Sequence, residues 1–135
     1  MRVLPGFVVI GGLVLAAAGC GYGRPKYYEG PTVEAFSGQV TQAGQPVTFP
    51  EDEEVIVRLT TVEGAKTFGV PIKADGTFSI GWMPIGKMAA RLERGFKDPA
   101  KQVGPPRGYS IPGGLTIEPG KTTGYTIELG KAWKR

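Results

Sequence analysis

Hydrophobic and polar residues alternate with a period of two along the chain from residue 34 onward. This alternation is typical of β-strands that bury one face and expose the other to solvent. It predicts roughly seven short strands with a turn about every eight to twelve residues, and no convincing helix. The pattern therefore favours an all-β domain, a single antiparallel β-sandwich of the immunoglobulin-like kind. Residues expected to share a face within a strand are Phe36 and Val40; Val55, Val57 and Leu59; Phe68, Val70 and Ile72; Phe78, Ile80 and Trp82; Met88, Ala90 and Leu92; Tyr125, Ile127 and Leu129.

Glycine and proline residues mark the positions where the predicted strands turn. Gly44 can supply a positive φ in the first turn, and Asp75-Gly76 is the strongest hairpin signal in the chain. Pro71 indicates an edge strand, because proline cannot donate a hydrogen bond to a central ladder. Residues 83–86 read as a further turn. Residues 94–108 read as one long irregular stretch, followed by two short extended pieces before the last strand.

The first 20 residues have a different composition. Arg2 is followed by an uncharged apolar run, which ends in Ala17-Ala18-Gly19 directly before Cys20. A positive start, a short apolar centre and a small-residue end are typical of an export signal, and the run is marginal for a membrane span. Cys20 is the only cysteine, so the domain can form no intramolecular disulfide.

This ending resembles the bacterial lipobox, in which the signal is cleaved before a cysteine that carries lipid. The resemblance implies cleavage between Gly19 and Cys20, a diacylglycerol on the Cys20 thiol and a third chain on its amine. Two or three chains anchor a protein stably where one does not. We therefore expect an exported protein anchored to a bacterial membrane, its domain facing the periplasm or the cell surface, and Gly21 after the cysteine favours the outer membrane. The alternatives are an ordinary signal peptide with a lone cysteine, and a single-pass anchor.

These observations divide the chain into three parts: a lipoprotein signal peptide at 1–19, the lipidated cysteine and a flexible tether at 20–33, and the β-sandwich at 34–135. The tether is rich in glycine and proline, and its residues 21–32 would reach about 35 Å when fully extended. Its residues Tyr27 and Tyr28 have two open interpretations. They could rest at the lipid headgroups or pack against the domain.

Three segments of the domain resemble the carboxypeptidase regulatory-like domain, which has a transthyretin-like (prealbumin-like) β-sandwich fold. They are FSGQVTQAGQPV at 36–47, KADGTF at 73–78 and PIGKM at 84–88, with Ala74 and Met88 departing from the family pattern. The whole chain is also similar to small bacterial lipoproteins that consist of a signal, a lipobox and one such domain. The matching residues are turn and core positions, so the resemblance implies an architecture and leaves the function open.

Composition excludes several classes of function. The chain has 135 residues, no histidine and a net charge of +4. No block of basic residues indicates nucleic-acid binding. Serine residues have no histidine to activate them, and Cys20 would be consumed by lipid, so we expect no enzyme activity, no cofactor and no metal. The acidic run at 51–54 could gather carboxylates for Ca²⁺, but consecutive residues point in different directions, which favours a solvated turn.

Two candidate binding features remain. The long stretch carries Arg94, Lys97, Lys101 and Arg107, a basic set that could dock an envelope protein or an anionic glycan. Trp133 lies near the end of the chain and is the better candidate for an exposed aromatic contact, whereas Trp82 is expected in the core.

The sequence therefore favours a non-catalytic lipid-anchored envelope protein, whose sandwich serves as a binding or spacer module. A carbohydrate- or peptidoglycan-binding module that uses Trp133, the tyrosines and the basic stretch is the alternative, and a small hydrolase is a remote one.

Overall fold

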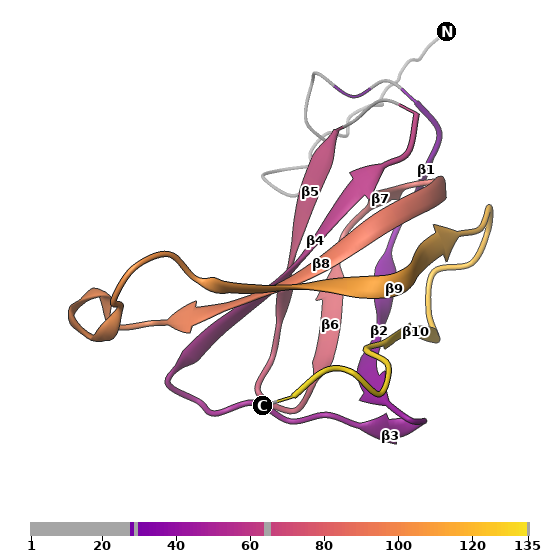
Figure 1. Ribbon diagram of the computed structural model, residues 1–135. Coiled ribbons are helices and arrows are strands. Elements are labelled where there is room, and N and C mark those ends of the chain that lie inside the picture. Colours follow the sequence, from indigo (N-terminus) through magenta and orange to yellow (C-terminus); the bar gives the residue numbers. More distant parts are fainter. Residues whose placement is uncertain (1–27, 29, 64–65, 135) are drawn as a thin grey trace, which may run out of the picture.

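The computed structural model describes residues 28, 30–63 and 66–134, which form a two-layered β-sandwich (Figure 1). Ten strands and one short 3-10 helix lie in this part of the chain. Seven of these strands are longer than two residues, in agreement with the number predicted from the alternation. The elements are β1 Thr32–Val33, β2 Phe36–Gln42, β3 Gln45–Pro46, β4 Glu53–Thr61, β5 Thr67–Ile72, β6 Thr77–Ile80, β7 Met83–Pro84, β8 Gly86–Phe96, the 3-10 helix Pro99–Lys101, β9 Arg107–Ile117 and β10 Tyr125–Glu128.

The larger layer is an antiparallel sheet in the order β5-β4-β8-β9. The second layer is centred on β2, which pairs with β6 in antiparallel and with β10 in parallel orientation. Strand β3 folds back on the end of β2, and β1 forms a separate two-residue pair with β7. The prediction of an all-β sandwich is therefore confirmed.

The inward residues of the larger sheet follow the predicted alternation. On β4 every second residue is buried, and β5 and β8 show the same period. Pro71 lies on β5, which is an edge strand and pairs with β4 alone among the described strands. Removing these side chains from water is the main source of stability for a domain without disulfides. The buried core of this sheet comprises Val55, Val57, Leu59, Phe68, Val70, Ile72, Met88, Ala90, Leu92, Ile111, Leu115 and Ile117.

Aromatic rings fill the core side of the second sheet. The Phe36 ring centroid lies 5.0 Å from that of Phe78 and 4.9 Å from that of Tyr125. Gly38 makes room for these rings, because a Cβ at this position would meet the Tyr125 carbonyl oxygen and lie 2.9 Å from Cζ of Phe78. The glycine in the first predicted strand is thus a packing requirement.

One end of the sandwich is closed by a second aromatic group. Trp82 is half-buried, and its ring centroid lies 5.4 Å from that of Phe68 and 6.1 Å from that of Tyr28. Tyr28 also packs edge-on against Phe68 at 5.7 Å. Of the two interpretations of this tyrosine, the structure supports packing against the domain.

The Asp75-Gly76 turn joins strands of different sheets. Gly76 has a φ of +85°, its amide donates to the Lys73 carbonyl, and the Lys73 amide donates to the Thr77 carbonyl. Beyond this turn β5 pairs with β4 and β6 pairs with β2. The turn was predicted correctly, but the two-stranded hairpin was not, because each flanking strand finds its partner far away in sequence.

Three further differences concern the segments around β8. Residues 83–86, expected to be a turn, contain β7, and Met83 is almost fully buried. The two extended pieces expected after residue 108 are one strand, β9, which bulges opposite Ala89 where Gly113 and Gly114 adopt positive φ. Strand β8 continues to Phe96 and β9 begins at Arg107, so the irregular stretch is shorter than predicted.

Candidate functional site

The β8–β9 hairpin, defined as residues 94–108, extends beyond the rest of the larger sheet (Figure 1). Phe96, the last residue of β8 before the tip, pairs with Glu53 at the start of β4. Met88, near the start of β8, pairs with Thr61 at the end of β4. Strand β1 pairs with β7, immediately before β8 begins. The tip and the first strand of the domain therefore lie at opposite ends of β8, whose 11 residues span about 35 Å.

Local hydrogen bonds hold the tip of this hairpin. The Phe96 amide donates to Oε1 of Gln102 at 2.8 Å, and Nε2 of Gln102 donates to the Gly104 carbonyl at 3.0 Å. Gln102 lies over Gly95, where a Cβ would come within 2.7 Å of Oε1. Asp98 caps the 3-10 helix by accepting from the Ala100 amide. Nothing in the residue pattern of the sequence singled out Gln102 or Gly95, because both act through contacts across the turn.

Three of the four basic residues predicted to form a binding loop are exposed on this hairpin: Lys97, Lys101 and Arg107. Lys101 forms an exposed ion pair with Asp52, with Nζ 3.6 Å from Oδ2. Lys97 and Arg107 have no ion pair within the described part of the chain. The tip therefore presents uncompensated positive charge. It also presents apolar surface, because Phe96 is 39% and Val103 is 91% exposed.

Arg94 does not belong to an exposed loop, contrary to the prediction. It lies on β8 with its side chain on the buried face, and only 9% of that side chain is accessible to solvent. Nε and Nη2 of Arg94 donate to the two carboxylate oxygens of Glu53 at 2.8 and 2.9 Å. Successive side chains of a strand point to opposite faces, so Arg94 points inward like Leu92 two residues before it. Glu53 points inward for the same reason, because it precedes the buried Val55 by two residues on β4.

Trp133 is buried as well, with 6% exposure, so the prediction of a surface aromatic is wrong. Its ring packs edge-on against Phe49 at 6.2 Å, and the Arg94 guanidinium lies over both rings, 5.7 Å from the Trp133 centroid and 5.8 Å from that of Phe49. Nε2 of Gln42 donates to the Trp133 carbonyl at 2.8 Å. The C-terminal segment thus packs against the sandwich beside Phe49, and the Trp133 ring is not available for an exposed aromatic contact.

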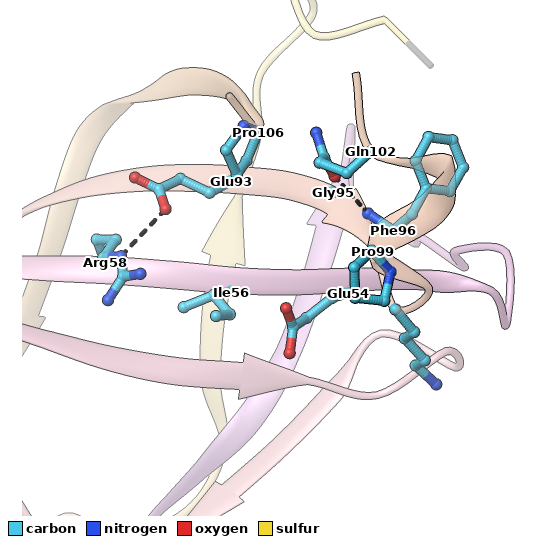
Figure 2. A pocket seen from close by; sticks show the side chains of 10 residues that line it. Glu54, Ile56, Arg58, Glu93, Gly95, Phe96, Pro99, Gln102 and Pro106 are labelled. Atoms are coloured by element: carbon cyan, nitrogen blue, oxygen red, sulfur yellow. Dashed lines mark hydrogen bonds and ion pairs between the residues drawn. The ribbon is translucent and has the colours of Figure 1, made fainter. Parts of the chain in front are cut away.

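A shallow groove lies on the outer face of the larger sheet beside the hairpin (Figure 2). Ile56 and Gly95 form part of its floor, and Glu54, Phe96 and Lys97 are among the residues around it. Nε of Arg58 donates to Oε1 of Glu93 at 3.1 Å across this face, so these charges neutralise each other. Figure 2 shows the Arg58–Glu93 pair on one side and Gln102 with Phe96 on the other. The groove carries no net charge, because its lining contains two acidic and two basic side chains.

A recess lies on the opposite, inward face of the hairpin. One part, about 250 Å³ in volume, is lined by Glu53, Arg94, Lys101 and Arg107 together with the apolar Val103 and Pro105. A second part of about 170 Å³ shares Arg94 and Arg107 and adds Tyr109, Trp133 and Lys134. The two parts are adjacent because they share both arginines.

Two carboxylates have lowered pKa values, and both stabilise turns. Backbone amides of Ala43 and Gly130, with the Thr41 hydroxyl and the Gly44 amide, donate to Glu128 and lower its pKa from 4.5 to about 2. The Thr77 hydroxyl and amide lower the pKa of Asp75. Each pKa is shifted by hydrogen bonds to the charged form, which makes these groups structural rather than reactive.

The described residues contain no arrangement of three or more histidine, cysteine or acidic side chains that could hold a metal ion. The acidic run at 51–54 is split by the fold. Glu51, Asp52 and Glu54 are exposed, as expected for a solvated turn, but Glu53 begins β4 and is committed to Arg94.

Cys20 and Gly19, the predicted lipidation and cleavage positions, lie outside the described residues. Within the described part of the chain, no helix has the length and apolar composition needed to cross a membrane. The chain matches no protein-family model, and no curated protein or solved structure matches it.

Proposed function

We propose that this chain is a non-catalytic, lipid-anchored protein of the bacterial cell envelope that presents the β8–β9 hairpin to an acidic partner protein. The proposed anchor is Cys20, because the apolar run and small residues before it have the pattern of a lipoprotein signal. Strand β1 begins at Thr32, so a short segment joins the proposed anchor to the domain.

The observation that carries this proposal is the position of the hairpin. The strand register places its tip at the end of β8 remote from β1, where the chain enters the domain. A protein tethered through residue 20 would therefore hold the tip away from the membrane. The tip combines the two features expected of a docking surface, uncompensated positive charge at Lys97 and exposed apolar side chains at Phe96 and Val103.

A glycan partner is the second candidate, and the same charge supports it when the glycan is anionic. The aromatic platform expected for sugar stacking is weaker than the sequence indicated, because Trp133 is buried and packs against Phe49. The hydrolase alternative gains no support from the described residues, because the lowered carboxylate pKa values belong to turns.

The anchor is tested by cell fractionation of the wild-type and Cys20→Ser proteins. The wild-type chain should partition with the membrane and carry an acylated N-terminal cysteine by mass spectrometry, and Cys20→Ser should release the domain from the membrane fraction. A Cys20→Ser protein that is processed and membrane-bound like the wild type would contradict the lipoprotein assignment.

The docking surface is tested with a photo-crosslinking amino acid placed at Val103, with Val62 as the matched position. Both valines are exposed, at 91% and 62%, but Val62 follows the end of β4 at the other end of the sandwich. We expect a discrete adduct from Val103 in intact cells that Val62 does not give. Lys97→Glu should abolish the adduct, and Lys87→Glu, the same charge change at the start of β8, should not.

Protease treatment of the adduct separates the two partner classes, because a crosslinked protein is degraded and a glycan is not. Equal labelling from Val103 and Val62, or an adduct insensitive to Lys97→Glu, would remove the hairpin from the proposal.

A further inference from the structure

The inward face of the β8–β9 hairpin places two arginines directly opposite each other. Arg94 on β8 and Arg107 on β9 are cross-strand partners in the antiparallel ladder, so their side chains leave the same face of the sheet. Like charges at directly opposed positions destabilise a sheet unless a counter-charge lies between them.

The protein supplies only part of that counter-charge. Glu53 is the acidic residue that lines the recess, and its two oxygens are both engaged by Nε and Nη2 of Arg94. Nη1 of Arg94 and the whole Arg107 guanidinium make no hydrogen bond within the described residues. Lys101, whose Nζ lies 3.6 Å from Oδ2 of Asp52, lines one part of the recess, and Lys134 adds positive charge at the other. Three cations and one carboxylate line the larger part.

The shape of the recess limits what can enter it. Its two parts, at about 250 and 170 Å³, are each below the roughly 300–1,000 Å³ typical of pockets that enclose a whole small-molecule ligand. Val103 and Pro105 add apolar surface beside the arginines. The recess therefore suits one charged group with the carbon atoms that carry it, rather than an entire large molecule.

We propose that the recess between Arg94 and Arg107 is an oxyanion-binding site that takes one carboxylate or phosphate group of a larger molecule. Guanidinium groups recognise both kinds of oxyanion through parallel N–H donors, and Arg107 has all of its donors unused by the described residues. Arg94 contributes through Nη1 while Glu53 holds it in place. The inference deepens the proposed docking role, because it names the chemical group of the partner that the hairpin would hold. It rests on that role in no other respect.

The experiment is isothermal titration of the full-length protein, in non-ionic detergent, with inorganic phosphate and separately with acetate. Chloride is the background salt, and ionic strength is held constant, because surface charge effects are screened by salt. Wild-type protein should bind at least one of the two probes saturably in the millimolar range or tighter. The probe that binds more tightly identifies phosphate or carboxylate as the source of the charge.

Arg107→Gln is the test variant, because its side chain is exposed and the domain should fold without it. Losing one charge-assisted pair of hydrogen bonds should weaken binding by about tenfold or more. Lys87→Gln is the matched control, because it removes an exposed positive charge at the start of β8, outside both the recess and the proposed docking tip. Its affinity should equal that of the wild type.

Two results would overturn the site. One is the absence of saturable binding by the wild-type protein to either probe. The other is an equal loss of affinity in Arg107→Gln and Lys87→Gln, which would mean that only the overall charge attracts the anion. Either result leaves the Val103 crosslinking experiment intact, because that experiment needs no small anion and is scored by its dependence on Lys97, which lies outside the recess. The oxyanion site and the docking role can therefore fail independently.

Discussion

Removing Glu53 should destabilise the domain strongly, because it would leave Arg94 buried without its counter-charge. Only 9% of the Arg94 side chain and 12% of the Glu53 side chain are accessible, and two hydrogen bonds of 2.8 and 2.9 Å join them. The Arg94 guanidinium also lies over the rings of Phe49 and Trp133. Packing against both rings limits the access of this charge to water.

The size of the effect follows from this burial. Breaking a buried ion pair by removing one partner costs about 3–5 kcal/mol, whereas replacing both partners with apolar residues is often close to neutral. We expect Glu53→Ala to lower the free energy of unfolding by about 3 kcal/mol, the low end of that range, because Glu53 keeps some access to solvent. Arg94→Met leaves Glu53 without its partner and should also cost about 3 kcal/mol, and the double variant should cost about 3 kcal/mol, a coupling of about 3 kcal/mol.

Urea unfolding of the four proteins, followed by tryptophan fluorescence, measures these values. Trp133 contacts the pair directly, so its emission should report the unfolding of this end of the sandwich. The denaturant slope should be the same in all four proteins if only stability changes. Additive effects, with the double variant less stable than Glu53→Ala by the full cost of Arg94→Met, would refute the reasoning that the two charges depend on each other.

Three further predictions concern single positions. Gly38→Ala should lower the free energy of unfolding in urea by at least about 2 kcal/mol, because its Cβ would meet the Tyr125 carbonyl and the Phe78 ring. Glu128 has a pKa lowered from 4.5 to about 2, so its hydrogen bonds stabilise the fold above pH 4.5 and this contribution is lost as the pH falls toward 2. Thermal unfolding of Glu128→Gln should show a lower Tm at neutral pH, and a smaller drop in Tm on acidification through this range than in the wild type. Gln102→Ala should speed hydrogen exchange at the Phe96 amide by about tenfold while exchange in the centre of β4 is unchanged.

The strands and their buried faces could be predicted because they depend on a local rule. A side chain on a strand points to the opposite side from its neighbour, so a run such as Val55, Val57 and Leu59 identifies its own buried face without knowledge of the partner strand. Pro71 was placed on an edge strand by the same kind of local argument, since its missing N–H is visible in the sequence.

Pairing between strands could not be predicted in the same way. Asp75-Gly76 specifies a tight turn, but the turn does not determine whether the flanking strands pair with each other or with β4 and β2. That choice depends on contacts between residues far apart in sequence. The parallel pairing of β10 with β2 is another such contact, because it brings Tyr125 beside Gly38. The resemblance to the carboxypeptidase regulatory-like domain stays a prediction.

The basic residues of the hairpin show why charge alone is a poor guide to a site. Arg94 and Arg107 have the same formal charge and oppose each other across one ladder, yet Glu53 engages Arg94 and leaves Arg107 without a partner among the described residues. The alternation that buries Leu92, carried two residues further, already points Arg94 inward, and the same step back from Val55 points Glu53 toward it. Counting basic residues groups Arg94 with Lys97. The alternation of side chains along the strand separates them, because Arg94 points inward and Lys97 is exposed. The alternation along β8 thus separates Arg94 from Lys97, and the position of Glu53 on the neighbouring strand β4 separates Arg94 from Arg107.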